Sequence, residues 1–257
     1  YRHLPTYEKI IRNLVSFYME NLMHGDLGIS YKKNVSVNTL IARGFPYTLS
    51  IGLLSIAVSA FIGILMGIWM ATSKRLAVKN TLLGIATLGV SIPGFVTAIL
   101  LMMIFGVWWP VLPIVGLGSP ANYILPVAAQ SFGQIASIAR LTKSTYSEAI
   151  QMDYVTMARA KGLSNLYITA RHVLKNALIP VVTYFGPAIA FLITGSFVVE
   201  SIFSIPGIGR EFTNAITNRD YTVVLGFSVF IGVIITVANL AVDIICSLID
   251  PRIKLTN

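Results

Sequence analysis

The sequence predicts an all-α polytopic membrane protein. Of its 257 residues, 55% are hydrophobic and only 11% are charged, whereas a soluble domain carries about 25% charged residues. The mean hydropathy is +0.77. Five segments are apolar over roughly the 20 residues that a helix needs to cross a bilayer. We therefore expect a bundle of membrane-spanning helices rather than a water-soluble fold.

The five predicted spans are separated by polar loops or by loops that contain glycine and proline. They cover residues 46–72, 81–109, 124–141, 177–199 and 223–248. The third span is the weakest because four polar side chains interrupt it: Gln130, Ser131, Gln134 and Ser137. Such a helix should face protein or a water-filled path rather than lipid.

The basic residues indicate which ends of the spans lie in the cytoplasm. Lys and Arg gather in residues 72–80, in the long segment after the third span and in the tail after the fifth. Residues 110–123 carry no charge, and residues 200–221 are nearly balanced. The positive-inside rule therefore places the first three regions in the cytoplasm. The formal net charge of +9 is explained by this topology and forms no continuous basic face that would indicate nucleic acid.

This topology divides the chain into three parts. We expect an extracytoplasmic region at 1–45, a membrane domain at 46–249 and a cytoplasmic tail at 250–257. An amino terminus outside the membrane also predicts a sixth helix before Tyr1, missing from this sequence.

The segment 148–180 is unusually long and polar for a connection between two spans. Good helix formers extend from Glu148 to Lys161, and Gly162 then suits a helix C-cap. Ser164 can cap a second helix that continues through Ile179. Two short helices joined at a glycine would form a knob on the cytoplasmic face. The alternative is a loop helix lying on the membrane surface.

The residues of this segment also carry a family resemblance. Residues 153–163 (DYVTMARAKGL) and 171–180 (RHVLKNALIP) resemble the coupling segment of binding-protein-dependent ABC importer permeases, in their oligopeptide, dipeptide and nickel branch. Thr156-Met157-Ala158 stands where the wider family has Glu-Ala-Ala, and Gly162 is the family glycine. Other motifs of this branch follow along the chain: residues 24–30 (HGDLGIS), 45–49 (FPYTL), 200–210 (ESIFSIPGIGR), 219–221 (RDY), Asp243 and 250–252 (DPR).

The resemblance covers nearly the whole chain and points to the first, B-type permease subunit. It implies a type I ABC importer permease fold, with five transmembrane helices in this chain. It also implies a homologous C-type permease, two ATPase subunits on the cytoplasmic side and an extracytoplasmic substrate-binding protein as partners. The expected location is the inner (cytoplasmic) membrane of a prokaryote, where the chain crosses several times among lipids. No cofactor is expected in this chain, since ATP and Mg would bind to the ATPase subunits.

The sequence is compatible with a subunit that receives energy from another chain, because it contains no Gly-x-x-x-x-Gly-Lys-Ser/Thr phosphate loop. A short helix outside the membrane can fit a groove on an ATPase. Tyr154, Met157 and Ala158 are expected on its buried face, with Arg159 and Lys161 at the rim. The predicted coupling residues are Asp153, Tyr154, Met157, Ala158, Arg159, Ala160, Lys161, Gly162 and Leu163.

Two glycine-rich motifs outside the membrane are candidates for a gate or for contact with the binding protein, although the second could be only a rigid loop. The candidate residues in these motifs are Gly25, Asp26, Gly28, Pro206, Gly207, Gly209 and Arg210, and Asp220 of residues 219–221 is a further candidate. A related motif, Ser91-Ile92-Pro93-Gly94, lies inside the second span and should break or kink that helix. The break could line a path or be a packing irregularity.

Two residues near the end of the last span have alternative interpretations. Asp243 could be functional, as an acid within a membrane often is. It could instead snorkel to the interface or pair with a nearby group, and its sidedness makes Arg140 a candidate partner. Cys246, the only cysteine, suits a small apolar packing residue and excludes an intrachain disulfide.

Other classes of function fit less well. A gradient-driven secondary transporter or channel should show charged relays inside the membrane, and the spans offer little besides Asp243. An enzyme is disfavoured because His3, His24 and His172 lie outside the spans, with no catalytic or metal-ligand spacing. Within the importer branch, oligopeptides or dipeptides are the expected substrate, with nickel or another small solute as the alternative.

Overall fold

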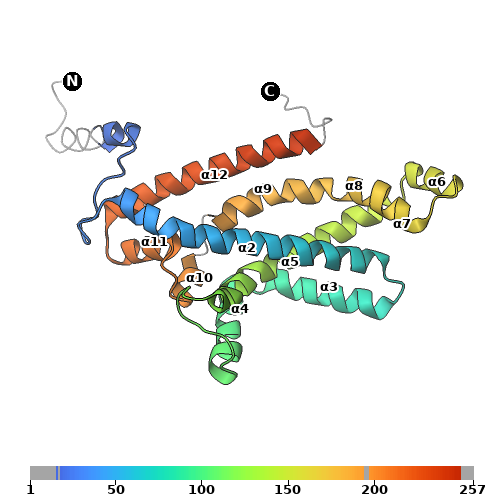
Figure 1. The fold of residues 1–257 in the computed structure, drawn as a ribbon, viewed down its shortest axis with the longest axis horizontal. Helices are drawn as coiled ribbons and strands as arrows, with labels where there is room; N and C mark the ends of the chain where they lie inside the picture. The colour runs from blue at the N-terminus through green and yellow to red at the C-terminus, as the bar shows by residue number, and fades with distance from the viewer. Residues whose placement is uncertain (1–15, 17, 194–196, 250–257) are drawn as a thin grey trace, which may run out of the picture.

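The long helices of the protein run roughly side by side along its longest axis (Figure 1). The structure is a computed structural model that describes residues 16, 18–193 and 197–249. The expectations for His3, for the tail after residue 249 and for the side chain of Cys246 lie outside the described part. Within that part all regular structure is helical, apart from an isolated bridge between Ile29 and Ser36. The expected all-α fold is confirmed.

The first predicted span is α2, Val37–Thr72. It begins nine residues earlier than predicted, so that Pro46 lies inside the helix. The reason lies in packing, since Val37, Leu40 and Ile41 are buried in a cluster with residues of α11, Ile208–Thr217, and α12, Tyr221–Ile249. Tertiary contacts of this kind commonly outweigh local helix signals.

The second predicted span is broken at Ile92 and Pro93. Helix α3, Leu76–Ser91, ends there, and α4, Gly94–Met102, continues into the π-helix η1, Met103–Trp108. The two parts differ in direction by 104°. Proline lacks an amide hydrogen and keeps the preceding residue extended, which is the conformation of Ile92. The predicted break at residues 91–94 of this span is confirmed.

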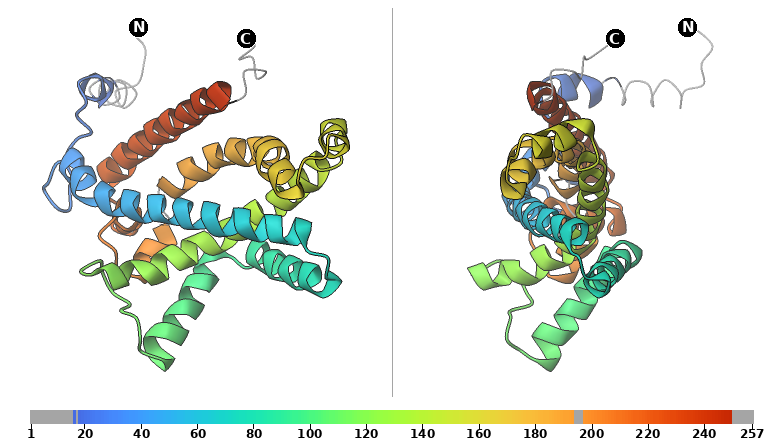
Figure 2. Two further views of the ribbon diagram at one scale, coloured as in Figure 1. Left: turned by 45° about the vertical axis from the view of Figure 1, so that its right-hand side comes forward. Right: turned by 90° about the vertical axis from the view of Figure 1, so that its right-hand side faces the viewer.

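The part after the break projects from the body of the molecule as an arm (Figure 1). The same projection is visible after a 90° turn of the view (Figure 2). Trp108 and Trp109 therefore lie at the tip of this arm rather than at the end of a straight span.

The third and fourth predicted spans are α5, Ile124–Ala149, and α9, Ile179–Ile193. Among the described residues, α2 and α12 are each long and apolar enough to cross a membrane, and the broken pair counts as a third if taken as one span. Helix α5 does not meet this criterion because it is too polar, as its interrupted sequence predicted. The described part of α9 is shorter than this criterion requires, and the predicted end of that span reaches α10, Phe197–Ile202, the next helix that the structure describes.

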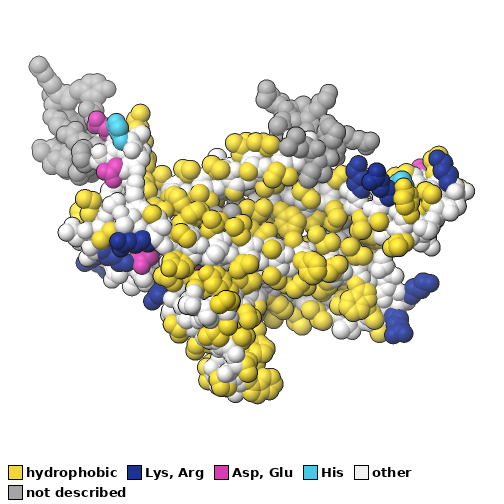
Figure 3. All heavy atoms as spheres, viewed as in Figure 1, with side chains coloured by type: hydrophobic (Ala, Val, Ile, Leu, Met, Phe, Trp, Pro, Cys, Tyr) yellow, Lys and Arg dark blue, Asp and Glu magenta, His cyan; other side chains and the backbone are white. Residues whose placement is uncertain are grey.

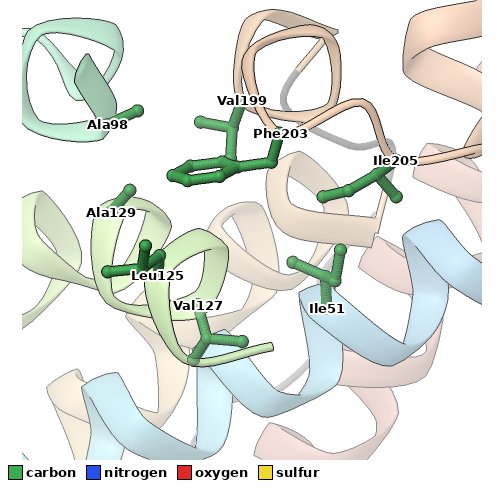
Figure 4. Close-up of a cluster of buried hydrophobic side chains, with 8 residues drawn as sticks. All are labelled: Ile51, Ala98, Leu125, Val127, Ala129, Val199, Phe203 and Ile205. Atoms are coloured by element: carbon green, nitrogen blue, oxygen red, sulfur yellow. The ribbon is translucent and has the colours of Figure 1, made fainter. Parts of the chain in front are cut away.

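One buried cluster joins these elements near the end that carries α10 and α11 (Figure 4). Phe203 and Ile205, which follow α10, meet Ile51 of α2 and Leu125 of α5 in this cluster. Ala98 of α4 also belongs to it, so the base of the arm is fixed to the body. Beyond this core, charged side chains gather at the two ends of the visible face, and its middle is mostly hydrophobic (Figure 3). This distribution agrees with helices that cross a membrane along the long axis.

Candidate coupling segment and external loop

The predicted knob is formed by α6, Asp153–Ala160, at one end of the molecule (Figure 1). The α5 helix includes Glu148 and Ala149, so the helix predicted from residue 148 is divided between α5 and α6. Helix α6 ends in a Schellman motif, in which the amide of Leu163 donates to the carbonyl of Ala158 and the amide of Gly162 to that of Arg159. Gly162 has a φ of +74°, which glycine adopts without strain. The predicted glycine C-cap is confirmed.

The second part of the knob begins where the sequence predicted it. Ser164 caps α7, Asn165–Ile168, by accepting a hydrogen bond from the amide of Tyr167 at 3.3 Å. The helical path then continues through a π-helical turn, η3, Thr169–Val173, and α8, Leu174–Ala177, toward α9. The coupling segment is therefore connected to a membrane helix by an almost continuous helical path.

Part of the predicted contact face of α6 packs against its own chain. Ala158 and Val155 are buried in a cluster with Tyr146 of α5, Ile168 of α7 and Val173 of η3. Tyr154 is half-buried and packs against the same cluster. Ala158 is therefore buried within the chain and helps to fix α6, whereas Tyr154 keeps part of its side chain exposed; contact of these two residues with an ATPase stays a prediction.

The free surface of the coupling segment is instead made by other side chains. Met157 and Leu166 are 62% and 80% exposed, and Met152, Leu163 and Tyr167 are also exposed. Arg159, Ala160, Lys161 and Asp153 are exposed as well. Sequence reasoning missed Met152, Leu166 and Tyr167; for Leu166 and Tyr167, the available signal was their place in the first turn after the Ser164 cap. Exposed apolar side chains outside the membrane are typical of an interaction site.

At the opposite end of the molecule, Glu200 of α10 is buried, and its carboxylate lies at the amino-terminal end of α11. Thr48 of α2 donates to Glu200 Oε1 at 2.8 Å and accepts from the amide of Ile208 at 3.0 Å. The amide of Arg210 donates to Glu200 Oε2 at 3.1 Å. An acidic group at a helix amino terminus is favoured by the partial positive charge there. This arrangement fixes the loop 200–210 to α2.

The glycines of this loop leave room for the carboxylate. A Cβ atom on Gly207 would lie 2.3 Å from Glu200 Oε2, and one on Gly209 would lie 2.9 Å from the same atom. Both glycines are buried, so they are packing residues of a rigid loop. Arg210 Nη1 donates to the carbonyl of Ser204 at 3.1 Å, which further closes the loop.

The other external motif, residues 24–30, is held by Asp220, which follows α11. Its carboxylate accepts from Ser30 Oγ and from the amide of Lys32, and the residue is only 3% exposed. Burial acts to raise the pKa of Asp220, but the hydrogen bonds from Ser30 and from the backbone amides of Lys32, Val223 and Tyr31 together hold that pKa below its ordinary value. An ion pair between Lys33 and Glu211 lies beside this contact.

The structure thus separates the eight predicted external residues into two groups. Gly207, Gly209 and Asp220 are buried within the chain, and Gly28 and Arg210 are partly covered. Only Gly25, Asp26 and Pro206 are exposed enough to meet a partner. The buried three pack within the chain, around Glu200 and Asp220, and contact of the external residues with a binding protein stays a prediction.

Two of the polar residues of the third predicted span, Ser131 and Gln134, face protein, as expected. Ser131 Oγ donates to the carbonyl of Ser55 in α2 at 3.2 Å, and Tyr184 of α9 donates to Gln134 at 2.9 Å. Asp243 is exposed on α12, and the described residues include no ion pair between it and Arg140.

These features define an all-helical membrane transport subunit with a helical knob at one end and a rigid loop at the other. The model for the binding-protein-dependent transport system inner membrane component matches residues 63–255. The chain therefore belongs to this family of multi-pass inner membrane permeases of ABC importers.

Curated relatives agree with this family. The chain is 41% identical over 240 residues to the dipeptide transport system permease protein DppB of Bacillus subtilis, covering 93% of this chain and 78% of the relative. It is also 41% identical to the oligopeptide transport system permease protein OppB of Escherichia coli K12, covering 92% and 78%. Because these relatives are DppB and OppB, they confirm the sequence-based expectation of a B-type permease.

Solved structures confirm the expected fold. An inward-facing structure of the MetNI methionine ABC transporter matches with a TM-score of 0.69 and 19% identity, over 82% of this chain and 96% of that chain. An amino acid ABC transporter with histidines matches with a TM-score of 0.62 and 18% identity, over 84% and 95%. The fold is that of a type I ABC importer permease.

Proposed function

We propose that this chain is the permease subunit through which an ATP-driven importer takes up oligopeptides or dipeptides. The observation that carries the proposal is the exposed apolar tip of the coupling segment, at the end of the molecule that the basic residues assign to the cytoplasm. The peptide substrate is supported by relatives at 41% identity that are named dipeptide and oligopeptide permeases.

The proposed partners follow from the two ends of the molecule. Two ATPase subunits, which bind ATP and Mg, contact the coupling segments of this chain and of a homologous C-type permease. An extracytoplasmic binding protein delivers the peptide to the end that carries the external loop, where Gly25, Asp26 and Pro206 are available for contact. The assembly lies in the cytoplasmic membrane of a prokaryote.

In the proposed mechanism, ATP-driven closure of the ATPases moves α6 and α7. The Schellman turn at Gly162 and the buried cluster around Val155 and Tyr146 make this segment rigid. Its motion therefore passes into α5, and through α8 into α9, rather than being lost in a flexible loop. The spans then tilt as rigid bodies and open the path alternately to the two sides.

The test is ATP-dependent uptake of labelled peptides by vesicles that contain the complete complex and its binding protein. We expect uptake of dipeptides or longer peptides that requires both ATP and the binding protein. Leu166→Asp should reduce uptake at least tenfold, because it places a charge in the apolar tip. The matched control is Met23→Asp, the same apolar-to-charged change at an exposed methionine of the external region, which should leave ATPase binding unchanged.

Two results would oppose the proposal. Uptake driven by an ion gradient without ATP would exclude an ATP-driven importer. Uptake of nickel but not of peptides would keep the architecture and replace the substrate.

A further inference from the structure

A polar cavity lies between α3 and α5, near the end of the molecule that carries the coupling segment. Farther from this end the two helices are in close contact, since a Cβ on Gly89 of α3 would lie 2.7 Å from the Cβ of Ala136. Toward the coupling segment they leave an open cavity of about 530 Å³. Its lining includes Leu83 of α3 and, from α5, Arg140, Lys143, Ser144 and Glu148.

The cavity is suited to a negatively charged ligand. Arg140 and Lys143 carry positive charge, and Glu148 is the one acid among the lining residues. The carboxylate of Glu148 accepts a hydrogen bond from Ser144 Oγ at 3.1 Å. In the part of the chain that the structure describes, the ion pair found lies at the opposite end of the molecule, so that Arg140 and Lys143 form an ion pair with no acid of that part.

A neighbouring cavity makes these surroundings more positive. It lies beside the coupling segment, has a volume of about 480 Å³ and shares Ser147 and Gln151 with the first cavity. Lys74 and Arg159 line it, and its lining residues include no acid. The two cavities together therefore present four basic side chains and one acid, which favours an anion over a cation.

The depth of the first cavity corresponds to the inner edge of the bilayer. Arg140 and Lys143 lie about 24 Å and 28 Å along α5 from its outer end at Ile124, at 1.5 Å per residue. The hydrocarbon layer is roughly 30 Å thick, so both residues lie close to its cytoplasmic surface. Lys79 lies one turn before Leu83 on α3 and adds a charge at a similar level. Long basic side chains at this depth extend toward the head groups.

A phospholipid fits the two kinds of surface that meet at this cavity. Its phosphate can accept hydrogen bonds from Arg140 and Lys143, and these bonds are strengthened by charge. Its acyl chains can lie along α3, where Ile85 and Leu88 are 46% and 59% exposed and face the surroundings of the bundle. A soluble phosphate would use only the basic side chains. Basic pockets between membrane helices on the cytoplasmic side commonly bind anionic head groups.

We propose that the cavity between α3 and α5 binds a phosphate group, and that the head group of an anionic phospholipid in the inner leaflet supplies it. Arg140 and Lys143 bind the phosphate, and the exposed side of α3 contacts the acyl chains. The site connects α3 to α5 where the two helices separate. It concerns lipid rather than the transported solute, so it does not depend on which substrate the importer carries.

The test is photolabelling of the complete complex in lipid nanodiscs with a phosphatidylglycerol that carries a diazirine at the start of one acyl chain. Adducts are mapped by mass spectrometry to peptides of α3 and α5. Adducts on α12, where Val237 and Leu240 are 57% and 59% exposed, report contact with bulk lipid and serve as the reference. We expect phosphatidylglycerol to label α3 and α5 about fivefold or more above this reference, and the same probe built on zwitterionic phosphatidylethanolamine to lose that excess.

Charge removal provides the first variant. Arg140→Gln/Lys143→Gln should reduce labelling of α3 and α5 about tenfold, because each basic side chain near the surface contributes to the attraction of anionic lipid. The matched control is Arg171→Gln/Lys175→Gln, which removes two exposed basic side chains at the same end of the molecule but outside the lining of this cavity. The control should leave the labelling unchanged.

Charge addition provides a second variant that keeps both basic residues, should the first assemble poorly. Ser144 is exposed in the same cavity. Ser144→Glu places a negative charge beside the phosphate and should reduce the labelling, whereas Ser144→Gln is similar in size, is neutral and should not. Both variants lose the hydrogen bond to Glu148 equally, so a difference between them reports charge.

Four results would overturn the proposal. Labelling by phosphatidylglycerol that does not exceed the α12 reference, or that phosphatidylethanolamine reproduces, would mean that the cavity does not select an anionic head group. Unchanged labelling in both Arg140→Gln/Lys143→Gln and Ser144→Glu would exclude these residues as the site. Loss of labelling on addition of soluble glycerol 3-phosphate would assign the cavity to a soluble phosphate. An absence of adducts on α3 and α5 would mean that a partner subunit fills the cavity.

Discussion

At the scale of single residues, Gly162 determines how the coupling helix ends. No atom lies within 4 Å of where its Cβ would be, so a side chain there meets backbone strain rather than a clash. Because φ is +74°, Gly162→Val should cost about 1–2 kcal/mol of stability. We expect a lower thermal midpoint for the purified permease and weaker co-purification of the ATPase subunits.

Two variants separate strain from a general loss of glycine. Gly162→Asn should have a smaller effect, since asparagine tolerates this conformation. Gly84→Val changes another glycine with open space, but one in ordinary helical conformation within α3, and should be nearly neutral. Equal losses at positions 84 and 162 would contradict the backbone explanation.

Asp220 gives a prediction about pH. A carboxyl group with a lowered pKa in the folded state stabilises the protein above its ordinary pKa, and this stabilisation is lost as the pH falls through the lowered pKa. Asp220→Asn should therefore lower the thermal midpoint at pH 7. The difference between this variant and the unchanged protein should shrink below about pH 4, the ordinary range of an aspartate.

The pH series can be measured by thermal unfolding in detergent. Ser30→Ala removes one of the hydrogen bonds that lower the pKa, so it should reduce the same pH-dependent difference in part. A difference between Asp220→Asn and the unchanged protein that stays constant down to pH 3 would count against this account.

At the scale of elements, α2 and α5 approach closely along a row of small residues. Ser55, Ser59, Gly63 and Gly67 follow at intervals of four and are all buried. A Cβ on Gly67 would lie 2.5 Å from Thr142 Cβ and 2.7 Å from the carbonyl of Ala139. Small residues allow membrane helices to pack in this way, where the hydrophobic effect between helices is absent.

Gly67→Val should therefore separate α2 from α5 and destabilise the permease by about 1–3 kcal/mol or more. The backbone carbonyl of Ala139 cannot move aside as a flexible side chain could. The yield of folded permease on size-exclusion chromatography measures the effect. Gly232→Val makes the same change on α12, where the site is open, and should leave that yield unchanged; an equal loss would mean that the close approach is unimportant.

At the scale of the whole molecule, α2 connects the two functional ends. Its 36 residues extend for about 54 Å. Gly44 near its start lies against Ile208 of the external loop, and Ala71 near its end packs against the cluster under α6. A movement of the coupling segment can therefore reach the external loop through one rigid helix, as the proposed uptake mechanism requires.

Local sequence signals predicted much of this arrangement. Apolar length predicted α2 and α12, Pro93 predicted the break in the second span, and Gly162 with Ser164 predicted the turn of the knob. Each of these features depends on the chemistry of one residue or a short segment. The family motifs also predicted the class of protein, because they recur in order along the chain.

The remaining features depend on contacts between residues far apart in sequence. Nothing near Ala158 indicates that it packs under Tyr146 and Val173, and nothing near Glu200 indicates that Thr48 of α2 will bind it. The direction of the arm after Pro93 likewise depends on how Ala98 packs against α5. The sequence by itself determined the long apolar helices, the break at Pro93, the turn at Gly162 and the family. Only the tertiary structure decided which of the predicted site residues remain exposed, because burial is a property of the assembled helices rather than of any one of them.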